Sequence, residues 1–265
     1  MSDLKAIIFD MDGTLADTEE LHRRAFNLAF REHACPLNWS RLEYKQLLSI
    51  SGGRERIGHC LQQAGMAGAE LQRTVDAVHQ TKSALYRQIL VSDVIKLRPG
   101  IRRLVQECRT AGLKLAIATS SSTDNVNTLL GRTFGSAGND FFPVVVTCDV
   151  VAEKKPSPAV YIRALSKLGL EAEHCIAVED TSNGNLAALA AGIHTVITTH
   201  PLTVDNDFSG ASLVLNHLGE PDKPFKVAAG AAYGRHFVDL DLLRTIHGAA
   251  SAAGPYLSRR ARAAV

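Results

Sequence analysis

The chain has 265 residues, of which 46% are hydrophobic, and its formal net charge is only +2. This length allows one large core, or one core with a small accessory domain. So small a net charge excludes a global field that would draw the protein to nucleic acid or a membrane. No apolar run approaches the roughly 18 residues that span a bilayer, and the N-terminus has no signal-peptide pattern. We therefore expect a cytoplasmic monomer with no nucleic-acid or membrane partner.

The cysteines are dispersed, odd in number and without a C-x-x-C pair, which favours reduced thiols in a cytoplasmic protein. They are Cys35, Cys60, Cys108, Cys148 and Cys175. Three arginines (Arg259, Arg260 and Arg262) lie in an Ala-rich C-terminal stretch, which indicates a frayed end rather than a binding site. Residues 251–265 are predicted to be a flexible tail.

A short apolar run from Ala6 to Phe9 predicts a strand buried on both faces, as in a parallel sheet. Asp10 and Asp12 follow it, two residues apart, so extended geometry would point both carboxylates to the same side. Gly13 then permits a sharp exit. Two close negative charges are costly unless a cation or a shared proton offsets them, and a divalent metal is the obvious solution.

Residues 17–93 predict only helices, which we expect to form an inserted cap. Asp17 and Glu20 have capping-box spacing, and apolar residues then follow a helical period. The helical segments are Glu19 to His33, Arg41 to Leu48, Glu55 to Ala64 and Glu70 to Leu90.

After this insert, strand and helix alternate, which predicts right-handed crossovers and a parallel sheet covered on both faces. The strands are Leu113–Ala118, Pro143–Thr147, Cys175–Val178, His194–Thr198 and an edge strand Leu213–Leu215. The helices are Ile101–Ala111, Asp124–Thr133, Pro158–Leu168, Asn185–Ala191 and a closing helix Val238–Ile246. The predicted fold is therefore α/β, a doubly wound core of residues 1–16 and 94–250 with the cap inserted.

Polar residues gather at the carboxyl ends of four predicted strands, where ligands bind in such sheets. They are Asp10 and Asp12, then Thr119-Ser120-Ser121, then the loop Lys154-Lys155-Pro156, then Glu179-Asp180. Each cluster alone has an ordinary structural interpretation, as a turn, a helix cap or a solvated strand end. Their placement at four separate strand ends favours a common functional site.

These residue types suit phosphoryl transfer. Asp10 can attack phosphorus as a nucleophile, and Asp12 can give a proton to the leaving oxygen and take one from water. Mg²⁺ prefers hard oxygen ligands, and it would find them on Asp10, the backbone carbonyl of Asp12 and Asp180, with Glu179 adjacent.

The remaining strand-end groups can stabilise a phosphoryl group. The Thr119 hydroxyl and the Ser120 amide, with Ser121 beside them, can hold phosphoryl oxygens. Lys155 can neutralise charge on the phosphoryl group and on Asp10.

Taken together, four segments resemble the motifs of the haloacid dehalogenase superfamily. They are Ile8 to Leu15, Ile117 to Ser120, Lys155-Pro156 and Val178 to Gly184. The resemblance implies a Rossmann-like core, dependence on Mg²⁺ and an aspartyl-phosphate intermediate. The true dehalogenases lack the second aspartate, so Asp12 favours a phosphatase or a mutase. A helical insert directly after the first motif resembles the beta-phosphoglucomutase-like subfamily, whose caps close over small sugar phosphates.

Three further segments resemble, within that subfamily, a phosphatase associated with carbon fixation. They are Thr18 to Asn27, Ser51 to Ile57 and Val238 to Leu243. Such enzymes remove the C1 phosphate of xylulose 1,5-bisphosphate, an inhibitory by-product of Rubisco. One departure from the pattern is Asp17, where a glutamate is expected to contact the substrate.

A bisphosphate needs a second anion site in the cap. The segment Ser51-Gly52-Gly53-Arg54 precedes a predicted helix, so it is either such a site or an ordinary flexible loop. Lys82 interrupts an apolar helical stripe and either extends to the rim or faces the substrate. The resemblance to the mutase relatives favours the second interpretation, in which Lys82 contacts the substrate.

Two further cap residues remain open. His22 is either a surface residue or, by the resemblance, a substrate contact. Asp17 either caps the first helix or accepts a sugar hydroxyl. We expect the hinge at Leu15 to Thr18 and Ser92 to Pro99, so that closure excludes bulk water.

Two alternatives to a sugar-bisphosphate phosphatase remain. A mutase on the same site would need a bisphosphate activator and would release no net phosphate. A non-catalytic binding protein would be expected to have lost Asp10, Asp12, Lys155 or Asp180, and all four are present.

Overall fold

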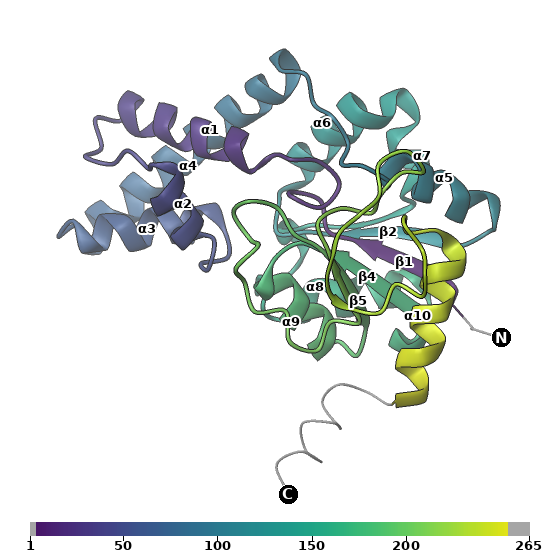
Figure 1. Ribbon diagram of the computed structural model, residues 1–265. Coiled ribbons are helices and arrows are strands. Elements are labelled where there is room, and N and C mark those ends of the chain that lie inside the picture. Colours follow the sequence, from purple (N-terminus) through teal and green to yellow (C-terminus); the bar gives the residue numbers. More distant parts are fainter. Residues whose placement is uncertain (1–3, 254–265) are drawn as a thin grey trace, which may run out of the picture.

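The structure is a computed structural model that describes residues 4–253 (Figure 1). Within them, seven strands form one sheet in the order β3-β2-β1-β4-β5-β6-β7. The strands are β1 (Ala6–Phe9), β2 (Lys114–Ala118), β3 (Val144–Val146), β4 (Cys175–Glu179), β5 (His194–Thr198), β6 (Leu213–Leu215) and β7 (Val227–Gly230). The first six run parallel, and β7 pairs antiparallel with β6.

Strand β1 lies at the centre of the sheet because every one of its residues is apolar and buried. Its side chains alternate between two hydrophobic cores, with Ile7 and Phe9 in one and Ala6 and Ile8 in the other. Phe9 is level with Val178 of β4, so the residues that follow the two strands meet at the same edge.

Helices cover both faces of the sheet, as expected for a doubly wound α/β fold (Figure 1). They are α5 (Ile101–Thr110), α6 (Thr123–Phe134), α7 (Gly138–Phe141), α8 (Ala159–Leu168), α9 (Ser182–Ala190) and α10 (Leu240–Ala253). Residues of α5, α6 and α10 join one core and residues of α8 and α9 join the other. The predicted fold class is confirmed.

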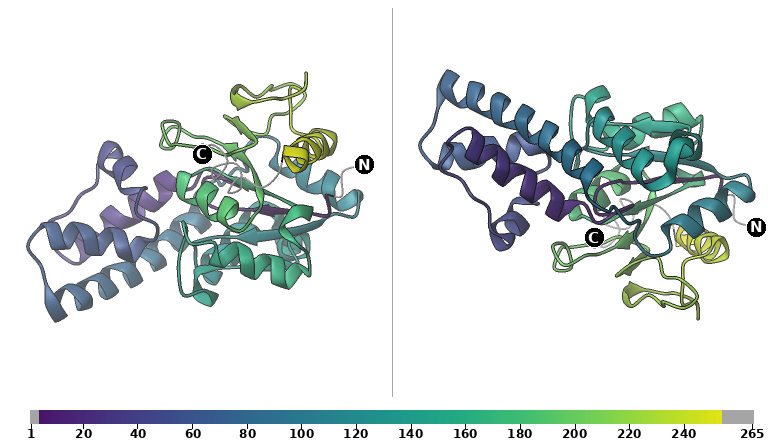
Figure 2. Two further views of the ribbon diagram at one scale, coloured as in Figure 1. Left: turned by 90° about the horizontal axis from the view of Figure 1, so that it is seen from below. Right: turned by 90° about the horizontal axis from the view of Figure 1, so that it is seen from above.

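The segment between β1 and α5, which is described throughout, is helical as predicted. It contains α1 (Glu19–Glu32), α2 (Arg41–Leu47), α3 (Gly53–Gln63) and α4 (Gly68–Ser92). These helices share a separate aromatic-rich core that includes Phe26, Phe30, Trp39 and Tyr44. They stand apart from the sheet, beyond its carboxyl edge (Figure 2).

The two chain segments that lead into and out of these helices lie side by side. Ala16 forms an antiparallel bridge with Leu97, and the Arg98 amide donates to the Leu15 carbonyl over 2.8 Å. The predicted hinge segments are therefore joined by backbone hydrogen bonds.

Several local predictions differ from the structure. The capping box of Asp17 and Glu20 is wrong, because Thr18 is the N-cap of α1 and no side chain caps that end. Strand β7 was not predicted, since its short Ala- and Gly-rich sequence carries little strand signal. The closing helix begins at Leu240 and extends to Ala253. The predicted flexible tail is therefore wrong for residues 251–253, which belong to this helix, and its remainder with the three arginines lies outside the described residues.

All five cysteines, which fall within the described range, are free. None of the helices in residues 4–253 is long and apolar enough to cross a membrane.

Candidate active site

A cavity of about 440 Å³ lies at the carboxyl end of the sheet, between the strand ends and the helices α1, α3 and α4. It is lined by most of the residues that the sequence singled out. These are Asp10, Asp12, His22, Ser51, Gly52, Gly53, Arg54, Lys82, Thr119, Ser120, Ser121, Lys155 and Asp180. Glu179 is fully buried next to this set, and Asp17 does not reach the cavity.

Lys155 joins the ends of three strands. Its ammonium donates to Asp10 Oδ1 over 2.6 Å, to Glu179 Oε1 over 2.5 Å and to the Ala118 carbonyl over 2.9 Å. Burial lowers the pKa of Lys155, but the charges of Asp10 and Glu179 outweigh burial and raise it well above its usual value. The ammonium is therefore charged at neutral pH and donates to both carboxyl groups.

Burial dominates at Asp10 and raises its pKa well above the usual value, although Lys155 opposes this effect. Glu179 and Asp180 raise the pKa of Asp10 further. One lysine does not balance three neighbouring carboxylates, so an ionised Asp10 requires more positive charge.

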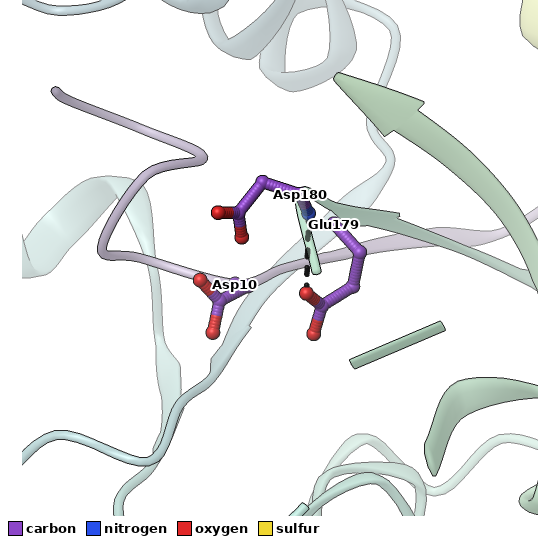
Figure 3. Close-up of side chains that lie close together, drawn as sticks. All are labelled: Asp10, Glu179 and Asp180. Atoms are coloured by element: carbon purple, nitrogen blue, oxygen red, sulfur yellow. Dashed lines mark hydrogen bonds between the residues drawn. The ribbon is translucent and has the colours of Figure 1, made fainter. Parts of the chain in front are cut away.

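These three carboxylates form the one cluster of potential metal ligands found among the described residues. Ligand oxygens of Asp10, Glu179 and Asp180 lie within 4.8 Å of one another (Figure 3). Oxygen donors, burial and excess negative charge all fit a divalent cation such as Mg²⁺. Glu179 fits less directly, because its oxygens already accept from Lys155, Tyr161 and the Asp180 amide.

Asp180 is fixed by two side chains and a glycine. Thr14 Oγ1 donates to one carboxylate oxygen over 3.1 Å, and His200 Nε2 donates to the other over 3.0 Å. Gly13 has a φ of 80°, and a Cβ added there would lie 2.3 Å from Asp180 Oδ2. The glycine thus permits both the turn and the close approach of the second carboxylate.

Asp12 faces the helical insert rather than the carboxylate cluster. Its Oδ1 accepts from Thr18 Oγ1 (2.6 Å) and Tyr86 (2.9 Å) and lies 3.1 Å from His22 Nε2, while Oδ2 accepts from Ser121 Oγ. Burial raises the pKa of Asp12, but His22 and the hydroxyl donors together bring it far below its usual value. Asp10 and Asp12 line one cavity but have different partners.

Side chains from α1 and α4 stack on one another next to Asp12. The His22 ring stacks on Tyr86 at 3.8 Å, and the Lys82 ammonium donates to His22 Nδ1 over 2.8 Å. Nε2 of His22 therefore carries the proton and is directed at Asp12. Lys82 is buried and lines the cavity, which favours the second of its two sequence interpretations, and His22 is not a surface residue.

Lys82 is expected to impose an alkaline limit on kcat/KM. Burial lowers its pKa to about 8, so its positive charge in the cavity is lost above that pH. The pKa of Lys82 is lower in the folded protein than in the unfolded chain, so the free energy of unfolding rises as the pH increases above the folded pKa. Activity is expected to fall over the same pH range. Measuring kcat/KM against pH for the wild type and Lys82→Arg tests this, because arginine stays charged and should remove the limit.

Lys223→Arg, at an exposed position between β6 and β7 and away from the cavity, is the matched control for that experiment. A Lys82→Arg enzyme whose alkaline limit is unchanged would show that another group titrates.

The remaining cap residues place positive charge at the cavity, though partly in ion pairs. Ser51, Gly52 and Gly53 line it ahead of α3. Arg54 also lines it, with its guanidinium paired to Asp76. Lys154, from the loop beside Lys155, donates to both carboxylate oxygens of Glu55 over 2.7 and 2.8 Å. This last pair connects the insert with the sheet at the cavity wall.

Asp17 is a correction to the predicted site. Its side chain is 72% exposed and pairs with Arg98 Nε at 3.2 Å, so its carboxylate is directed away from the cavity. Three residues of α1 line the cavity instead, namely Glu19, His22 and Phe26.

Arg98 is a buried residue that the sequence did not single out. Its guanidinium donates to four carbonyls, those of Gly13, Thr198, Thr199 and Asn216. These carbonyls belong to the turn after β1 and to the ends of β5 and β6. Arg98 therefore fixes the turn that carries Asp12 against the sheet.

Replacing Arg98 by methionine is expected to lower the free energy of unfolding by about 3 to 5 kcal/mol, because several buried carbonyls lose their donor. Asp17→Asn removes only the exposed partner and is expected to change it by less than about 1 kcal/mol. Urea denaturation of both variants measures the difference. Similar midpoints for the two would show that the buried donors contribute little.

Four further residues of the site were not predicted from the sequence, and for one of them, Tyr86, the sequence does contain a signal. Tyr86 is four residues after Lys82 on the same helical stripe, so it faces the same side. Arg98, Tyr161 and His200 carried no comparable signal, because their contacts come from distant parts of the chain.

Comparison with known proteins agrees with this geometry. Residues 4–192 match the sequence family described as haloacid dehalogenase-like hydrolase. The chain is 42% identical to the plasmid form of protein CbbY from Cupriavidus necator, over 92% of this chain and 97% of that one. It is 41% identical to CbbY from Rhodobacter capsulatus, over 79% of this chain and 91% of that one.

Two solved structures of CbbY from Rhodobacter sphaeroides are similar to this one, each with a TM-score of 0.76 and covering 81% of this chain and 94% of that one. One, at 40% identity, is a complex with phosphate. The other, at 39%, is a complex of an Asp→Asn variant with xylulose 1,5-bisphosphate. The chain is an enzyme of the haloacid dehalogenase-like hydrolase family, and within that family it belongs with the CbbY proteins.

Proposed function

We propose that this protein is a Mg²⁺-dependent phosphatase that converts xylulose 1,5-bisphosphate to xylulose 5-phosphate and phosphate. The observation that carries the proposal is the joint placement of Asp10, Lys155 and the acidic pair Glu179-Asp180 in a cavity that also holds Asp12. The bisphosphate bound to the similar CbbY protein supports the choice of substrate.

The proposed division of the chain assigns residues 1–16 and 94–250 to the catalytic core and residues 17–93 to a cap. The separate aromatic core of the insert supports this division. The paired segments at Ala16 and Leu97 are the proposed hinge. Contacts such as Lys154 with Glu55 and Asn183 with the Ser49 carbonyl then hold the cap against the core.

The proposed cation is Mg²⁺, held by Asp10, Asp180 and the backbone carbonyl of Asp12, with Glu179 as the neighbouring carboxylate. When bound, it supplies positive charge to phosphoryl oxygens and to the ionised Asp10. The rest of the proposed mechanism uses side chains of the chain itself.

In the first step, a carboxylate oxygen of Asp10 forms a bond to phosphorus and the bond from phosphorus to the sugar C1 oxygen breaks. Asp12 donates its proton to that leaving oxygen. A phosphate dianion bound beside Asp12 raises its low pKa by like-charge repulsion, so substrate binding favours the protonated acid. Thr119, Ser120 and Lys155 bind the phosphoryl oxygens.

In the second step, Asp12 takes a proton from a water molecule that attacks the phosphorylated Asp10. The bond from phosphorus to the Asp10 oxygen then breaks and phosphate leaves. His22 and Tyr86 hold Asp12 in position for both proton transfers. The second phosphate of the substrate binds the cap at the Gly52-Gly53 backbone and Arg54, and Lys154 of the core contacts it from the opposite wall of the cavity.

The test is phosphate release from a panel of pentulose and hexose phosphates, each assayed with Mg²⁺ and with a chelator. We expect the highest kcat/KM for xylulose 1,5-bisphosphate and no turnover in the chelator. Faster release from another compound, with none from this one, would reject the substrate. A requirement for a bisphosphate activator without net phosphate release would identify a mutase instead.

A further inference from the structure

Asn125 has a buried amide oxygen without a partner. It lies in the first turn of α6, is 5% exposed and lines the cavity. Its Oδ1 accepts no hydrogen bond from any residue that the structure describes. The other such atom within residues 4–253, Trp39 Nε1, lies in the helical insert and does not line this cavity.

Three polar side chains of the same loop and helix end have hydrogen-bond partners. Thr119 Oγ1 accepts from the Ser121 amide over 3.1 Å, Ser121 Oγ donates to Asp12, and Thr123 Oγ1 lies 3.0 Å from Thr147 Oγ1. Asn125 is the buried side chain of this loop and helix end whose oxygen has no partner in the part of the chain that the structure describes.

A second buried asparagine shows how the fold treats this side chain where its role is structural. Asn185 in α9 accepts from Thr195 Oγ1 over 2.7 Å and donates to the Ser209 carbonyl over 3.2 Å. Both ends of its amide are paired. Asn125 has no such arrangement, and a buried carbonyl without a donor lowers stability.

The chemistry of the missing partner follows from the rest of the cavity. Phosphate groups are matched by its cationic residues, among them Lys155, Lys154 and Arg54. A neutral amide is matched instead by a group that donates and accepts without charge, as a sugar hydroxyl does. Helix α6 holds Asn125 rigidly, because the neighbouring Val126 and Leu129 are buried in the core beneath it.

We propose that Asn125 is a specificity-determining residue whose Oδ1 accepts a hydrogen bond from a hydroxyl of the substrate's sugar. This inference rests on the proposed function and assigns a residue to the recognition of the sugar between its phosphates. Asn125 contributes to the turnover of polyhydroxylated phosphates and not to that of phosphate esters without hydroxyls.

The test compares two substrates, xylulose 1,5-bisphosphate and 4-nitrophenyl phosphate, which has no hydroxyl group. Asn125→Ala is expected to lower kcat/KM for the sugar by about tenfold or more, and to change it less than about twofold for the aryl ester. Asn127→Ala, on the exposed side of the same helix, is the matched control and should change neither value. An unchanged value for the sugar, or equal losses on both substrates, would overturn the proposal.

Asn125→Leu is the second variant, because it fills similar volume without a buried oxygen. Its thermal midpoint is expected at or above that of the wild type, with the same selective loss on the sugar. A lower midpoint with equal losses on both substrates would show a structural role. The wild-type rate on xylulose 1,5-bisphosphate decides the proposed function separately; if another sugar phosphate is turned over faster, the comparison is made on that compound.

Discussion

The substitution Asp10→Asn is expected to reduce phosphate release by at least about 10³-fold, because an amide oxygen cannot act as the nucleophile that Asp10 provides. The protein should remain folded, since Lys155 keeps Glu179 and the Ala118 carbonyl as partners. Initial rates on the sugar phosphate and on 4-nitrophenyl phosphate measure the loss, which should be equal on both. Turnover that survives the substitution would remove Asp10 from the chemistry.

The same substitution has an expected effect on stability that depends on pH. Burial raises the pKa of Asp10, so the folded protein holds this proton above the pH at which the unfolded chain loses it. Its contribution to stability is therefore present at low pH and is lost as pH rises through the folded pKa. Without divalent cations, Asp10→Asn should then have a higher thermal midpoint than the wild type at pH 8, with a smaller difference near pH 4.

Magnesium is expected to reverse that order at pH 8. A ligand that binds only the folded state stabilises it, so Mg²⁺ should raise the midpoint of the wild type more than that of Asp10→Asn. Asp180→Asn serves as the comparison, because it removes the other facing carboxylate of the cluster. Equal shifts in all three proteins would indicate that the cation binds elsewhere.

The regular part of the fold could be predicted because its signals are local. Apolar β-branched runs such as Val144–Val146 and amphipathic stretches such as Ile101–Thr110 specify their own structure. Their alternation also implies which strand ends meet, and this predicts that Asp10 lies near Lys155 and Asp180.

Contacts that depend on side-chain direction could not be predicted in this way. The spacing of Asp17 and Glu20 matched a capping box, but Arg98 from a distant segment pairs with Asp17 and Thr18 begins the helix. Glu179 is a second example of this limit. Its position next to Asp180 suggested a metal ligand, yet Lys155 and Tyr161 already occupy one of its oxygens.

Removing the charge of Lys155 is expected to have the largest combined effect. Lys155→Met leaves Asp10 and Glu179 buried without their shared ammonium, and breaking a buried ion pair in this way costs about 3 to 5 kcal/mol of the free energy of unfolding. Phosphate release should fall as well, because the phosphoryl oxygens lose a cationic partner.

A double variant separates these two effects. Adding Glu179→Gln to Lys155→Met removes one of the two unpaired charges and keeps a group that can accept from the Tyr161 hydroxyl, so part of the lost stability should return. Activity should not return, since the charge near the phosphoryl group is still missing. Urea denaturation and phosphate release on the wild type, both single variants and the double variant complete the cycle. If the two losses in stability simply add, Lys155 and Glu179 do not act as a pair, and the stabilising role of the lysine lies with Asp10 and the Ala118 carbonyl.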